Sequence, residues 1–118
     1  MWLEIFKTGN QTDSSGNLEA YTEEKLDKIA EIYNSKVQES SSYEAPLVKG
    51  HPASSEPAYG WVERLARRGN TLLAKIKEVS PELVEQVKKG MYKKISMSIY
   101  KDMLLRHVGL LGAVPPAV

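Results

Sequence analysis

The chain has 118 residues, of which 42% are apolar and 26% charged, so it has room for one domain with a single core. Its 16 Lys and Arg against 15 Asp and Glu give a net charge of +1, which excludes a strongly basic nucleic-acid binder and a polyanionic tail. The absence of Cys excludes a disulfide framework, a thiol nucleophile and a Cys-ligated metal centre. The chain has two histidines, neither with metal-ligand spacing, so we expect no metal and no cofactor.

The charge is unevenly distributed along the chain. Residues 1–58 carry five basic and ten acidic side chains, whereas residues 59–118 carry eleven basic and five acidic ones. The opposite net charges predict that the two halves attract each other within one body. The apolar start of the chain is interrupted by Glu4 and is too short for a signal peptide or a membrane span, so we expect a cytoplasmic protein.

The first half predicts a strand, a loop, a helix and a second strand. Aromatic and branched residues predict a strand over 2–7, and the Gly, Asn, Asp and Ser of 9–16 predict a mobile surface loop. Thr22 and the acids after it predict a helix start. The apolar residues that recur at helical spacing are Leu26, Ile29, Ala30, Tyr33 and Val37. The Ser-rich stretch 38–43 ends this helix, and 45–49 predicts an internal strand.

The second half predicts four strands and a helix. Residues 61–65 and 72–76 flank Gly69 and Asn70, a pattern typical of a hairpin. Ser80-Pro81-Glu82 predicts a helix start, and Gly90 ends that helix. Two further strands follow: 93–99 alternates with a period of two, and 104–111 is almost continuously apolar, which predicts burial on both faces. About six strands and two helices predict an α+β domain or a small, mostly antiparallel β-barrel flanked by helices.

Two polar residues in these last strands are candidates for chemistry. If the turn is 101–102 or 100–103, Ser96 lies opposite His107, with Cβ atoms about 4.5 to 5.5 Å apart. A three-residue turn would instead pair Met97 with His107. The alternative to chemistry is that the hydroxyl and the imidazole only satisfy each other or a backbone group.

His51 is the candidate base. Serine hydrolysis needs a base within hydrogen-bond reach of the hydroxyl and a third group that orients the base. His51 follows a predicted strand, between Gly50 and Pro52, which would hold its side chain rigidly at the edge of a sheet. The alternative is an exposed turn histidine without a role.

Two groups of motifs resemble one known family. The first is Val48-Lys49-Gly50-His51-Pro52 followed by Pro57-Ala58-Tyr59-Gly60-Trp61-Val62, and the second is Gly90-Met91-Tyr92-Lys93-Lys94-Ile95-Ser96 followed by Leu105-Arg106-His107-Val108-Gly109-Leu110-Leu111-Gly112. In this order, and with the ending Pro115-Pro116-Ala117-Val118, they resemble the Mu-like phage head maturation proteases and scaffold proteins. The resemblance covers 1–118 in outline and is densest from 46 to 118.

The resemblance implies a herpesvirus-protease-like barrel and a serine endopeptidase that cleaves scaffold and major capsid protein precursors inside the assembling prohead. It implies that Ser96 is the nucleophile, His51 the general base and His107 the group that orients His51. A homodimer is possible by the same comparison. Family members usually continue into a helix-rich scaffolding segment, so we expect 1–118 to be a single protease domain without that segment.

Other assignments remain open at this stage. Ser98 lies on the same strand face as Ser96 and is a rival nucleophile, and Glu63 is a second possible orienting group. A non-catalytic capsid-assembly or scaffold interaction module is the alternative function. The basic residues near 67–68 and 88–94 could indicate a nucleic-acid binder, but aromatic residues are not interleaved with them, so we expect no nucleic acid and no membrane as partners.

Overall fold

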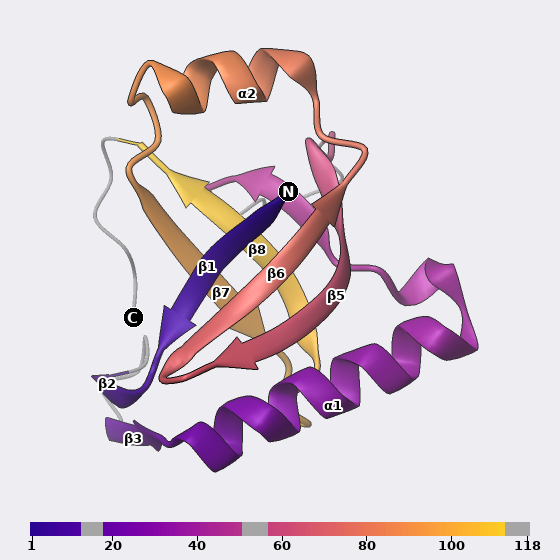
Figure 1. Ribbon diagram of the computed structural model, residues 1–118, viewed down its shortest axis with the longest axis vertical. Coiled ribbons are helices and arrows are strands. Elements are labelled where there is room, and N and C mark those ends of the chain that lie inside the picture. Colours follow the sequence, from indigo (N-terminus) through magenta and orange to yellow (C-terminus); the bar gives the residue numbers. More distant parts are fainter. Residues whose placement is uncertain (13–17, 51–56, 113–118) are drawn as a thin grey trace.

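The computed structural model describes residues 1–12, 18–50 and 57–112. Its main sheet has six strands in the order β1-β6-β5-β4-β8-β7 (Figure 1). In that order the strands are β1 (Trp2–Lys7), β6 (Thr71–Lys77), β5 (Gly60–Arg68), β4 (Pro46–Lys49), β8 (Leu105–Leu111) and β7 (Lys94–Ile99). All neighbours are antiparallel except β4 and β8, which are parallel, so the sheet is mixed.

The helices cover two ends of this sheet. In Figure 1, α1 (Glu23–Glu39) runs below the sheet and α2 (Pro81–Lys88) lies above it. Both helices and all six strands of the main sheet match the elements expected from the sequence to within a few residues. A short 3-10 helix, η1 (Ser41–Tyr43), lies between α1 and β4, within the Ser-rich stretch where the first helix was expected to end.

The expected closed barrel is wrong, and with it the herpesvirus-protease-like architecture. The edge strands β1 and β7 lie near each other, but no backbone ladder joins them in the described residues, so the sheet is open. Leu83 of α2 is buried and, with Leu3 of β1 and Ile95 of β7, lines an apolar cavity between the two edge strands. Apolar side chains therefore lie where a closed barrel would have a hydrogen-bonded ladder.

The loop expected over residues 9–16 is corrected over 9–12, and its residues 13–16 lie outside the described residues. Gly9–Thr12 (β2) and Leu18–Tyr21 (β3) form a separate two-stranded antiparallel ribbon. The Tyr21 ring packs edge-on against Phe6 of β1, with ring centroids 4.7 Å apart, which ties the ribbon to the main sheet. Gly and Asn are poor strand formers, so the local composition hid this pairing.

Helix α1 begins where its sequence predicts. The Thr22 side chain accepts a hydrogen bond from the backbone N–H of Lys25, and two glutamates follow in the first turn. The buried face of α1 is formed by Leu26, Ile29, Ala30 and Tyr33. These residues join one core cluster, which also contains most of the buried apolar side chains of the main sheet.

Polar side chains of α1 make hydrogen bonds to the backbone of β5 that a neighbouring strand would otherwise make. Strand β4 pairs only with the beginning of β5, at Gly60 and Trp61, and the rest of that β5 edge faces α1. The Tyr33 hydroxyl donates to the carbonyl of Val62 and accepts from the N–H of Ala45, at 2.5 and 2.7 Å. Asn34 bonds both backbone groups of Leu65, donating at 2.8 Å and accepting at 2.9 Å. This edge is therefore hydrogen-bonded without a neighbouring strand.

Among the described residues, no helix is long and apolar enough to cross a membrane.

Candidate functional site

Ser96 and His107 lie on adjacent strands, but they are not direct partners. Strand β7 pairs with β8 so that Ser98 lies opposite His107 and Ser96 lies opposite Gly109. The expected Ser96–His107 register is thus displaced by two residues. Ser96 is instead a diagonal neighbour of His107, a position typically about 7 to 8 Å away between Cα atoms.

The turn between β7 and β8 explains the displacement. The N–H of Tyr100 bonds to the carbonyl of Leu104 at 2.8 Å, which leaves a three-residue turn, Lys101–Met103. Met103 has a φ of 72°, the left-handed conformation that ends such a turn. This turn alone would pair Met97 with His107, and a register shift between Ser98 and Ile99 moves the pairing by one more residue.

The three candidate side chains on these two strands share one face of the sheet. Side chains alternate along a strand, so Ser96, Ser98 and His107 lie on the face opposite Ile95, Met97 and Val108. Ser96 is 9% exposed and His107 is 8% exposed, so both are buried. Among the described residues only Thr71 is another buried polar side chain. Two of the three buried polar groups are thus diagonal neighbours.

The end of β4 lies beside this face, on the far side of β8. The N–H of Gly50 bonds to the carbonyl of Leu110 at 2.8 Å, and Val48 is aligned with Gly109. Along β8 this end is therefore closer to the level of Ser96 than to the level of Ser98, by two residues or about 7 Å. His51 itself lies outside the described residues, so its predicted role as base stays a prediction.

Gly109 separates β4 from Ser96 on this face. It lies in the middle strand, with Val48 on one side and Ser96 on the other. Because glycine has no side chain, β8 itself places no side chain between Val48 and Ser96. Gly109 is itself buried.

Glu63 does not belong to this group. It lies on β5, which is separated from β8 by β4, and its carboxylate is 3.3 Å from the Lys75 ammonium in a half-exposed ion pair. The structure therefore gives Glu63 a surface role and removes it as an orienting group. No cluster of three metal-ligating side chains occurs in ranges 1–12, 18–50 and 57–112.

From the sequence, Ser98 ranked below Ser96 as a partner of His107, but Ser98 is the serine directly opposite that histidine. Its position opposite His107 follows from the left-handed turn residue and the bulge, which have no strong signature here because Met103 occupies the position that Gly usually takes. One local signal was present: Asp102 accepts a hydrogen bond from the N–H of Leu104 at 3.1 Å, which is typical of an Asx turn. The serine opposite the imidazole and the serine nearer the end of β4 are thus different residues.

Comparison with known proteins finds no matching family model, and no curated protein or solved structure with significant similarity to the chain.

Proposed function

We propose that the chain is a serine endopeptidase in which Ser96 is the nucleophile, His51 the general base and His107 the residue that orients His51. The observation that carries the proposal is the shared face of β7 and β8, where Ser96 and His107 are both buried and lie diagonally to each other. The end of β4, from which the chain continues to His51, is closer to the level of Ser96 than to that of Ser98.

The proposed reaction has two steps. The Ser96 oxygen attacks the carbonyl carbon of a peptide bond while His51 takes the hydroxyl proton; the C–N bond then breaks and His51 returns the proton to the leaving amine. A water molecule next attacks the acyl-enzyme ester, losing its proton to His51, and Ser96 is released as the alcohol. His107 contributes a hydrogen bond without a full negative charge, so the triad is weaker than one with a buried Asp, and slow turnover is expected. No metal or cofactor takes part.

The substrate class rests on the resemblance to the phage head maturation proteases. We propose that the cleaved bonds are in scaffold and major capsid protein precursors, and that cleavage occurs inside the assembling prohead in the cytoplasm of a bacterial host. An enzyme that acts once in each particle has no need of fast turnover. The substrate would present the bond in an extended segment, since proteases read the backbone of their substrates in that form.

The test is intact mass spectrometry after treatment with a fluorophosphonate, which labels only activated serines. We expect one adduct on the wild type and none on Ser96→Ala, with labelling retained in Ser98→Ala. Ser42→Ala is the matched control, because Ser42 is exposed and remote from the two strands. Loss of the adduct in Ser98→Ala alone would transfer the nucleophile to Ser98.

A non-catalytic scaffold interaction module is the second candidate. The burial of Ser96 and His107 favours it, because 9% and 8% exposure are also what two structurally satisfied side chains show. Under this alternative no serine is activated, so neither wild type nor variants gain an adduct. The same experiment therefore separates the two functions.

A further inference from the structure

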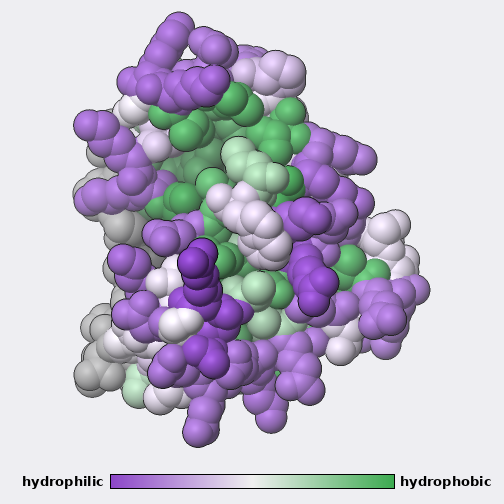
Figure 2. Space-filling model, in the orientation of Figure 1, coloured by the Kyte–Doolittle hydropathy of each residue, from purple (hydrophilic) through white to green (hydrophobic). Residues whose placement is uncertain are grey.

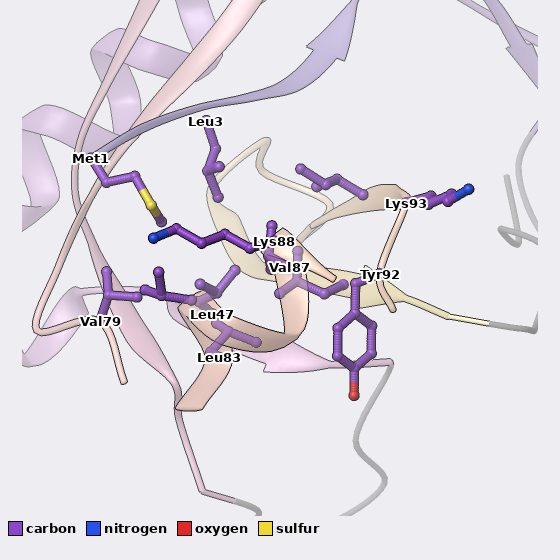
Figure 3. Close-up of a pocket in the computed structure, with 12 residues that line it drawn as sticks. Met1, Leu3, Leu47, Val79, Leu83, Val87, Lys88, Tyr92 and Lys93 are labelled. Carbon is purple, nitrogen blue, oxygen red and sulfur yellow. The ribbon is translucent and has the colours of Figure 1, made fainter. Parts of the chain in front are cut away.

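An apolar cavity of about 260 Å³ opens between the two edge strands, beneath α2. Leu3 of β1 and Ile95 of β7 form opposite sides, Leu83 and Val84 of α2 form the roof, and the buried Leu110 of β8 lies at the base. Figure 2 shows apolar surface exposed below α2, and Figure 3 shows Leu3 of β1 together with Leu83 and Val87 of α2 around the pocket. The full lining is Met1, Leu3, Leu47, Val79, Leu83, Val84, Val87, Lys88, Tyr92, Lys93, Ile95 and Leu110.

This cavity is separate from the candidate active site. Ile95 and Leu110 line it, whereas their chain neighbours Ser96 and Gly109 lie on the opposite face of the sheet. A ligand in the cavity would therefore not touch Ser96 or His107. The inference below stands whether or not the chain is a peptidase.

The charges of the cavity all have the same sign. Lys88 and Lys93 line it, and no carboxylate does. Within the part of the chain that the structure describes, neither lysine has an ion-pair partner. In Figure 3, Lys88 extends from α2 toward Met1, which precedes β1, whereas the Lys93 ammonium points away from the other labelled side chains. An unpaired cation at an apolar cavity favours a ligand with a hydrocarbon body and an anionic end.

We propose that this cavity binds an unbranched aliphatic carboxylate of medium length, with the hydrocarbon chain beneath Leu83 and Val84 and the carboxylate beside Lys88. At about 30 Å³ for each methylene, close to the volume share of a water molecule in the liquid, the cavity holds about eight to ten carbons. Burial of the chain supplies the affinity, and the lysine selects the charge of the head group.

The first experiment is a calorimetric titration of the protein with decanoate, compared with decyltrimethylammonium and with butyrate. Saturable binding of decanoate at or below about 1 mM is expected from the size of the ligand. The cationic analogue should bind at least threefold more weakly, and butyrate should not bind. Equal binding of the two ten-carbon compounds would overturn the assignment of charge, and absence of decanoate binding would overturn the site.

Variants locate the ligand. Lys88→Gln should weaken decanoate binding about twofold to fivefold, since Lys88 is exposed and an exposed ion pair contributes little. Lys89→Gln is the matched control, because Lys89 is the next residue and does not line the cavity; it should leave affinity unchanged. Val84→Phe fills the cavity and should abolish binding. Equal losses in the two lysine variants would contradict the proposal.

A second measurement uses the wild-type protein, so its result does not depend on whether Val84→Phe folds. In wild-type protein, nuclear Overhauser contacts from decanoate methylenes should reach the methyl groups of Leu3, Val84 and Ile95. Contacts confined to the exposed Met1 and Val87 would place decanoate on the surface and overturn the proposal. Dimerisation that decanoate fails to reverse would also overturn it, because the cavity would then serve a second copy.

Discussion

Ser98 and His107 are cross-strand partners in the β7–β8 hairpin, and this pairing places Ser96 opposite Gly109. One imidazole therefore has a serine directly across from it and a second serine diagonal to it. A directly opposed hydroxyl and imidazole can satisfy each other, whereas a diagonal hydroxyl is left for another partner. This arrangement is why variants of both serines are needed to assign the nucleophile.

The roles proposed for the histidines predict unequal losses. His51→Ala should reduce the rate of fluorophosphonate labelling nearly as much as Ser96→Ala, because the serine loses its base. His107→Ala should slow labelling about 10- to 100-fold and leave the adduct on Ser96, because a positioning residue acts through the base. The rates follow from intact mass against time.

Thr71→Ala is the control for the histidine variants. Thr71 is a buried polar residue like His107 but lies on β6, away from β7 and β8. It should lose stability without losing labelling. Equal and small losses in the Ser96, His51 and His107 variants would show that the three residues form no triad.

Asn34 predicts a stability effect. Asn34→Ala removes the amide that bonds both the N–H and the carbonyl of Leu65, and should lower the free energy of unfolding by about 1 to 3 kcal/mol. Ser35→Ala, at the exposed neighbouring position of α1, should change it by no more than about 0.5 kcal/mol. Urea unfolding of both variants checks this; a similar midpoint shift in both would refute the role of the amide.

Tyr33 predicts a loss of stability in alkali. Burial disfavours the phenolate and raises the pKa of Tyr33 from 10.0 to about 12. The folded chain thus holds this proton more tightly than the unfolded chain, so the stabilisation is complete below pH 10 and is lost as the pH rises toward 12.

The measurement for Tyr33 is the urea midpoint as a function of pH between 9 and 12, read with Tyr33→Phe and Tyr43→Phe. Tyr33→Phe should be less stable at neutral pH by about 1 to 3 kcal/mol, because Val62 and Ala45 lose a buried partner. It should also show a shallower alkaline decline. Tyr43 is exposed, so its variant should keep the wild-type curve; an identical decline in all three proteins would contradict the prediction.

Gly60 predicts a packing conflict. A Cβ at this position would lie 2.8 Å from Cγ2 of the buried Ile76, so Gly60→Ala should cost about 1 to 3 kcal/mol. In an Ile76→Ala background that methyl group is gone, and the same substitution should cost clearly less. A double-mutant cycle in urea measures the coupling. Additive effects of the two substitutions would mean that the contact with Ile76 is not the cause of the destabilisation by Gly60→Ala.

The parts of the fold that could be predicted depend on near neighbours in sequence. Thr22 marks a helix start because its cap acts within one turn, and Pro81 marks another because its fixed φ suits the first helical position. Gly69 with Asn70 marks a hairpin because its strands follow at once. The open sheet could not be predicted. Closure would need hydrogen bonds between β1 and β7, which lie far apart in the sequence, so no local pattern indicates whether they pair.

The candidate site was predictable only in part. Alternation along 93–99 placed Ser96 and Ser98 on one face, and the apolar run 104–111 placed His107 in a central strand. The serine opposite His107 could not be found, because the left-handed Met103 and the bulge each shift the register by one residue without a distinctive sequence pattern.

The side chains of α1 along β5 also bear on solubility. Tyr33 and Asn34 occupy backbone groups that another chain could otherwise use to add a strand. Detachment of α1 would therefore expose an aggregation-prone edge as well as core surface. The two outermost strands, β1 and β7, are the only edges of the main sheet, within the described residues, that remain open to strand addition while the helix stays docked. Docking of α1 is thus what keeps separate copies of this chain from joining through their interior strands.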